Sequence, residues 1–154
     1  MKKLLALTLL LFSINGFAEM KSLSEYMDER PNITQKEVLY VQLRCLGFHK
    51  AYINILEGNT GKGAEELLKQ MQSRYIIMDG DYRLMYFSVF PDRKISVEEF
   101  NKDLEEKISA LEIKYLAIAD ENYLNTGSYF QDSEFLKSEL DSCNLVYRAL
   151  NSPA

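Results

Sequence analysis

Residues 34–58 read TQKEVLYVQLRCLGFHKAYINILEG, and this stretch decides the fold. It opens with Thr34-x-x-Glu37, a capping box in which each of the two side chains can accept a hydrogen bond from a free backbone N–H at a helix start. Behind it, apolar residues recur at alternating steps of three and four, which places them on one helical face. These residues are Val38, Val41, Cys45, Phe48, Tyr52 and Ile55. Gly58 ends the pattern, so the stretch predicts an amphipathic helix that needs partners.

The next segment, from about Ala64 to Pro91, repeats this spacing over a longer range. Its apolar residues are Leu67, Met71, Tyr75, Met78, Tyr82, Met85 and Val89. An Asp79-Gly80 pair inside the segment is also a hairpin signal. The periodicity stays in phase across Gly80, however, and the flanks do not alternate as strands should. We therefore predict a helix, in which a kink or break near Gly80 is the alternative, since glycine costs about 1 kcal/mol relative to alanine in a helix.

Two further helices follow. Ser96-x-x-Glu99 is a second capping box, and the helix behind it ends at Asn125-Thr126-Gly127. The last helix starts near Asp132 or Ser133 and runs to about Leu150. Four amphipathic helices joined by short loops predict an all-α fold, an antiparallel up-down-up-down four-helix bundle forming a single domain at residues 33–151.

The two cysteines of the chain, Cys45 and Cys143, fall near the middles of the first and last helices. These helices are antiparallel neighbours in an up-down-up-down bundle, so we predict a disulfide between the two residues. Closing a loop of nearly 100 residues stabilises a fold by up to about 4.7 kcal/mol in the chain-entropy model. Two buried free thiols are the alternative.

The N-terminus carries an export signal. Lys2 and Lys3 precede an apolar run from Leu4 to Ile14, and Gly16 and Ala18 occupy the positions of a small-x-small cleavage site. We predict a signal peptide at residues 1–18, since the apolar run is too short to span a membrane. The expected location is the periplasm, with secretion as the alternative, and no membrane attachment after cleavage.

Residues 19–32 form a polar N-terminal segment, in which we predict a short helix near residues 24–29 that ends before Pro31. The full chain has a formal charge of −5, and removal of the two signal lysines makes it −7. No cluster of lysine and arginine offsets this charge. Nucleic acid is therefore not expected as a partner, because its binding relies on neutralising phosphates.

Few residues suggest chemistry. His49 is the sole histidine, so neither a multi-histidine metal site nor a histidine-paired nucleophile can be assembled, and we predict no enzyme, metal site or cofactor. Met71, Met78 and Met85 lie seven apart beside Tyr75 and Tyr82. This row is typical of an ordinary core stripe, but a Cu(I) site or a groove for a partner peptide would show the same spacing.

The sequence thus favours an exported, non-enzymatic helical interaction or binding protein with an unidentified protein partner. Ten tyrosines and no tryptophan suit contact surfaces that are partly wet. The candidate surface consists of Met71, Tyr75, Met78, Tyr82, Met85 and His49. The alternatives are a carrier that holds haem, Cu(I) or a small apolar molecule between helices, and a structural or stress-related periplasmic protein.

Overall fold

The structure, a computed structural model, describes residues 20–59, 61 and 63–151. Within this range it contains five helices and no strands, which confirms the all-α class. The helices are α1 (Leu23–Asp28), α2 (Gln35–Glu57), α3 (Ala64–Val89), α4 (Val97–Thr126) and α5 (Glu134–Leu150). The predicted signal peptide lies outside the described residues.

Most helix starts follow from side-chain caps. Thr34 and Ser96 form the two predicted capping boxes at α2 and α4, and Ser22 forms a third, with Glu25, at α1. The predicted short helix near residues 24–29 is confirmed as α1. Ser133 caps α5 through a hydrogen bond from the Leu136 N–H. Each cap satisfies backbone donors that would otherwise lack partners at the helix start.

The segment around Gly80 is one helix. α3 continues without a break from Ala64 to Val89, so it forms neither a hairpin nor two helices. Met71, Met78 and Tyr82 of its apolar stripe are buried on both sides of the glycine. Burial of an in-phase stripe outweighs the cost of about 1 kcal/mol that one glycine adds to a helix.

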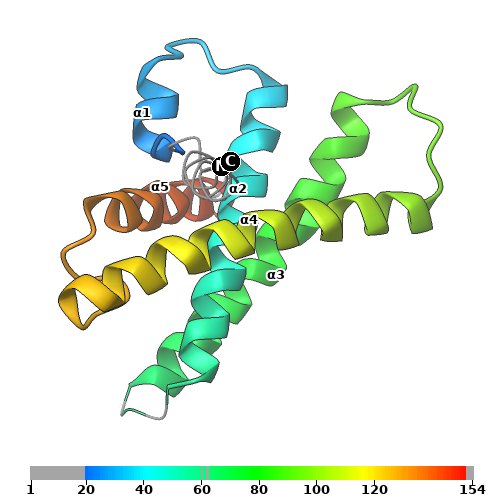
Figure 1. The fold of residues 1–154 in the computed structure, drawn as a ribbon. Helices are drawn as coiled ribbons and strands as arrows, with labels where there is room; N and C mark the ends of the chain where they lie inside the picture. The colour runs from blue at the N-terminus through cyan, green and yellow to red at the C-terminus, as the bar shows by residue number, and fades with distance from the viewer. Residues whose placement is uncertain (1–19, 60, 62, 152–154) are drawn as a thin grey trace, which may run out of the picture.

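The arrangement of the helices agrees with the expected one only in part. α2 is central and packs against both α3 and α4, while α5 contacts α1, α2 and α3 over shorter stretches. In Figure 1, α2 and α3 lie side by side and α4 runs across them rather than alongside. With five helices and this crossing, the up-down-up-down four-helix bundle is not confirmed.

Gly47 explains how α4 can cross so close to α2. A Cβ atom added at Gly47 would lie 2.4 Å from the Cβ of Leu111 and 3.4 Å from the backbone nitrogen of Glu112. Glycine alone permits this approach of two helix backbones, because any larger residue would push α4 away. Gly47 thus lets the backbones of α2 and α4 approach closely where the two helices cross.

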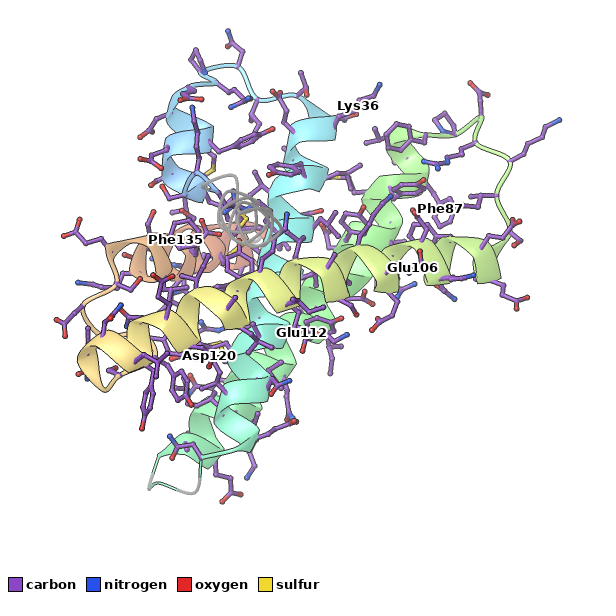
Figure 2. All side chains as sticks on the ribbon, in the orientation of Figure 1. Lys36, Phe87, Glu106, Glu112, Asp120 and Phe135 are labelled. Atoms are coloured by element: carbon purple, nitrogen blue, oxygen red, sulfur yellow. A yellow bond between two sulfur atoms is a disulfide. The ribbon has the colours of Figure 1, made fainter. Side chains whose placement is uncertain are left out.

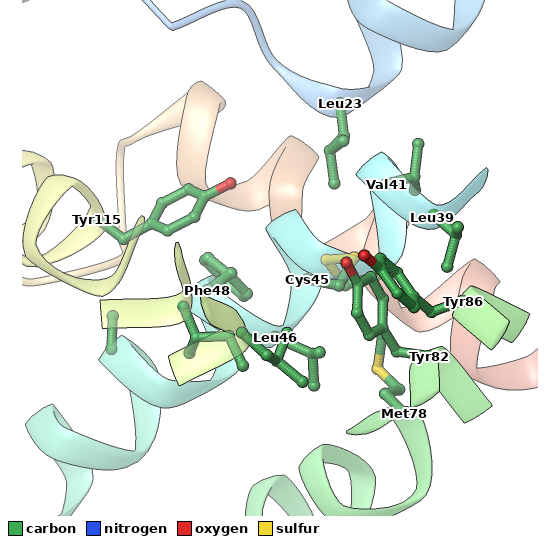
Figure 3. Packing of buried hydrophobic residues seen from close by; sticks show 14 of the residues in the cluster. Leu23, Leu39, Val41, Cys45, Leu46, Phe48, Met78, Tyr82, Tyr86 and Tyr115 are labelled. Atoms are coloured by element: carbon green, nitrogen blue, oxygen red, sulfur yellow. A yellow bond between two sulfur atoms is a disulfide. The ribbon is translucent and has the colours of Figure 1, made fainter. Parts of the chain in front are cut away.

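The predicted disulfide is confirmed. Cys45 on α2 and Cys143 on α5 are joined, with their Cα atoms 5.4 Å apart, and both are fully buried. Figure 3 shows Cys45 among core residues that come from several helices, including Leu23 of α1 and Tyr82 of α3. The short helix α1 is therefore joined to the same core as the long helices, rather than lying apart from it.

Among the residues that the structure describes, none of the helices is both long and apolar enough to cross a membrane.

Candidate functional site

A buried ion pair links α2 to α5. The Arg44 Nη2 atom lies 2.8 Å from Glu139 Oε1, and the two side chains are only 1% and 0% exposed. Arg44 also donates from Nε to the Tyr115 hydroxyl at 3.1 Å and from Nη1 to the Lys21 carbonyl at 2.8 Å. Each of the three guanidinium nitrogens thus donates a hydrogen bond, as a buried arginine requires.

The carboxylate of Glu139 is equally well satisfied. In addition to the Arg44 bond, Oε1 accepts a hydrogen bond from the backbone N–H of Leu23 at 2.6 Å, and Oε2 accepts one from the Tyr115 hydroxyl. We call Arg44, Tyr115, Glu139 and the backbone of Lys21 and Leu23 the buried polar cluster. Its members come from α2, α4, α5 and the start of α1, so it joins four elements of the fold.

Burial and the neighbouring charges shift the pKa values of all three side chains in the cluster. Burial raises the pKa of Glu139, and the Arg44 guanidinium opposes that rise. Burial disfavours the charge on Arg44, but Tyr115 and Glu139 outweigh it and raise the pKa of Arg44. Burial, and then the charge of Glu139, raise the pKa of Tyr115 well above its usual range. Tyr115 therefore remains a neutral donor, and the arrangement is that of a structural network.

One surface hollow meets the cluster at Lys21 but at none of the buried side chains of Arg44, Tyr115 and Glu139. The hollow beside α1 and α5 has a volume of about 620 Å³ and is lined by residues such as Ser24, Phe135 and Ser138, but not by Arg44 or Glu139. Catalysis needs a group within reach of the reacting atoms. The cluster accordingly acts on the fold, by fixing α1 and α5 against α2.

Sequence reasoning missed the cluster, although one signal was present. Arg44 follows Val41 by three residues and precedes Phe48 by four, and Glu139 follows Leu136 by three and precedes Cys143 by four. Both charged residues therefore occupy apolar-stripe spacing. A charge in the middle of an apolar stripe is rarely fully buried unless it is paired, and two such charges of opposite sign suggest each other as partners.

His49 is a core residue rather than a ligand. It is fully buried, its Nδ1 lies 2.8 Å from the Cys45 carbonyl oxygen, and its Nε2 has no protein partner among the described residues. Burial lowers the pKa of His49 to about 4, against the opposing effect of the Cys45 carbonyl bond. The imidazole is therefore neutral at physiological pH.

This shifted pKa predicts a loss of stability in acid. A histidine whose folded-state pKa lies below its ordinary 6.5 stabilises the fold fully above pH 6.5, and that contribution is lost as the pH falls toward about 4. Between pH 7 and pH 4.5, the free energy of unfolding of the wild type should fall by about 2 to 3 kcal/mol more than that of a His49→Phe variant. Urea unfolding followed by circular dichroism at both pH values tests this. Parallel losses in the two proteins would contradict it.

The predicted methionine and tyrosine surface lies mostly inside the protein. Met71, Met78 and Tyr82 are buried, and Tyr75 and Met85 are only partly accessible. The stripe faces α2 and the core, as Figure 3 shows for Met78 and Tyr82. As placed, these residues and His49 pack the interior and do not form an open groove.

The opposite face of α3 is the exposed apolar one. Ile76 is 68% exposed, Leu84 76% and Phe87 41%, and Gly80 lies between them on the same side of the helix. Figure 2 shows Phe87 close to the start of α4, where its ring lies 4.9 Å from that of Phe100. We call Ser73, Ile76, Gly80, Leu84 and Phe87 the outer face of α3. Sequence analysis did not identify this second apolar stripe.

No family model, curated protein or solved structure matches this chain. Within the described part of the chain, no group of three or more histidine, cysteine, aspartate or glutamate side chains is placed to hold a metal ion.

Proposed function

We propose that the protein is an exported, non-enzymatic interaction protein of the periplasm, which binds another protein through the outer face of α3. The observation that carries this proposal is the exposure of Ile76, Leu84 and Phe87 on one side of a single helix. Single exposed apolar residues are ordinary, but a contiguous group on one face marks an interaction site.

The scaffold behind this face suits a binding role. α3 is held on its other side by the buried stripe that includes Met71, Met78 and Tyr82. A binding face built on a packed helix keeps its geometry, which lowers the entropy lost on association. The ion pair between Arg83 and Asp79, with the Arg83 hydrogen bond to Asn101, further fixes α3 to α4 beside the outer face.

The proposed compartment is supported by two features. The N-terminal sequence has the composition of an export signal. The buried disulfide between Cys45 and Cys143 is of a kind that persists in oxidising compartments and is rare in the cytosol.

Site-specific photo-crosslinking in cells that export the full chain tests the proposal. A photoreactive phenylalanine analogue at position 84 should give a discrete protein adduct on irradiation. The same analogue at Leu145, which is 59% exposed on α5, is the matched control and should give none. Equal labelling at the two positions, or no adduct at position 84, would show that the outer face of α3 has no protein partner.

A further inference from the structure

The outer face of α3 is symmetric about Gly80. Ile76 and Leu84 lie four residues before and after the glycine, and Ser73 and Phe87 lie seven before and after it. Steps of four and seven residues return to the same side of a helix. When such a face meets a copy of itself in the antiparallel direction, each residue before Gly80 opposes one after it.

No close contact within the described part of the chain requires a glycine at position 80. A Cβ atom added there would meet nothing within 4 Å, in contrast to Gly47. Glycine destabilises a helix interior relative to alanine. An exposed glycine in the middle of a 26-residue helix therefore lowers the stability of the helix, and no contact within the described chain offsets that loss. A glycine at this point does allow a second helix backbone to approach closely.

The outer face of α3 carries no charged residue, and this affects how strongly it repels a second copy of the chain. Its five residues are uncharged, and Arg83 at its margin is already bonded to Asp79 and Asn101. Two copies of an acidic protein repel each other over most of their surfaces. An uncharged face with no free acid is where that repulsion is least.

We propose that the partner is a second copy of this chain, bound through α3 against α3 in the antiparallel direction, with the two helices crossing at Gly80. Ile76 of each copy then packs on the partner subunit's Leu84, and Leu84 on the partner subunit's Ile76. This is an isologous, two-fold contact, the commonest kind in homodimers. The inference rests on the proposed function and specifies its partner.

The expected contact is small. A crossing of two helices that covers two turns on each side of Gly80 buries less than about 1,200 Å² in total, which is the class of weak and transient interfaces. Each copy has its own buried core and disulfide. The dimer should therefore form reversibly with rising concentration, in the micromolar range, from folded monomers.

Sedimentation equilibrium of the exported protein tests the dimer. The wild type should shift from monomer to dimer as its concentration rises, and Leu84→Glu should weaken the association at least tenfold while its circular dichroism spectrum is unchanged. Leu145→Glu, at an exposed leucine of α5, is the matched control and should dimerise like the wild type. Gly80→Ala should raise the urea midpoint of the dilute monomer and yet weaken the association several-fold.

Cysteine cross-linking tests the crossing point. A Gly80→Cys variant should form a covalent dimer on mild oxidation. Ile76→Cys alone should not, but an equal mixture of Ile76→Cys and Leu84→Cys should. A wild type that stays monomeric at millimolar concentration overturns the second-copy inference, and a specific adduct to a different protein at position 84 would then leave the proposed function standing. A dimer that Leu84→Glu does not weaken overturns the assignment to this face.

Discussion

An Arg44→Met variant is expected to lose about 3 to 5 kcal/mol of its free energy of unfolding, because it leaves the Glu139 carboxylate buried without a cation. Methionine follows the aliphatic part of the arginine side chain, so little packing is lost with the charge. The remaining donors to Glu139, the Leu23 N–H and the Tyr115 hydroxyl, are both neutral. Urea unfolding followed by circular dichroism at pH 8 measures the loss.

The same variant should recover part of its stability in mild acid. Burial raises the pKa of Glu139 and the Arg44 charge opposes the rise, so removing Arg44 leaves that pKa higher still. A carboxyl group with a raised folded-state pKa contributes stability that is fully present below its unfolded pKa and is lost as the pH rises through the folded pKa. The deficit relative to wild type should therefore be smaller at pH 5 than at pH 8.

Two controls separate the buried charge from general damage. In an Arg44→Met, Glu139→Leu double variant both charges are gone, so the loss should be smaller than the sum of the two single losses. A Lys69→Met variant removes an exposed ion pair with Glu65, which has an N–O distance of 2.9 Å, and should cost far less stability than Arg44→Met, because solvent screens the pair. If Arg44→Met cost no more than Lys69→Met, the buried pair would have no stabilising role.

The individual helices could be predicted because their signals are local. A capping box such as Thr34 with Glu37 lies within four residues, and an apolar stripe repeats within one helix. The disulfide between Cys45 and Cys143 could also be predicted, since a chain with two cysteines has one possible intramolecular pair. The helices could be predicted without knowledge of how they cross, and the disulfide required only that the first and last helices be neighbours.

The crossing itself could not be predicted because it depends on contacts between helices. Gly47 appears in the sequence as one small residue in α2, and only the position of Leu111 on α4 shows why it must be small. Arg44 and Glu139 are far apart in the sequence, and each alone is most easily interpreted as an exposed charge. Their burial becomes favourable only when α2 and α5 meet.

The candidate surface of methionine and tyrosine lies on the side of α3 that the core covers, and this could not be foreseen for a related reason. The candidate surface was chosen from the regular stripe of methionine and tyrosine, which is the strongest apolar face of α3. The strongest apolar face of a helix is, however, the one that the core covers. The outer face, with Ile76, Leu84 and Phe87, is weaker and is interrupted by Gly80. Only the packing of α3 on α2 reveals which of two apolar faces remains exposed.

Replacing both cysteines, Cys45→Ala with Cys143→Ala, is expected to lower the free energy of unfolding by about 4 kcal/mol. The disulfide closes a loop with a sequence separation of 98, and in the chain-entropy model a loop of that size contributes up to about 4.7 kcal/mol. Urea unfolding of the variant and of the oxidised wild type measures the difference. Mass spectrometry after thiol alkylation without reductant is the control, and two labelled thiols in the wild type would contradict the premise.

Removal of the disulfide should lower the local stability of α5 and α1 before that of the rest of the domain. α2 packs extensively against α3 and α4, whereas α5 contacts its neighbours over shorter stretches. α1 is held to α5 by the hydrogen bond from the Leu23 N–H to Glu139. Without the disulfide, α5 remains joined to α2 by the Arg44 pair and apolar contacts, so its opening costs less than global unfolding. Hydrogen exchange should then show amides of α5 and α1 losing protection while those of α2 and α3 keep theirs. Equal loss in all five helices would mean that the domain opens as one cooperative unit, with the disulfide acting on the unfolded chain alone.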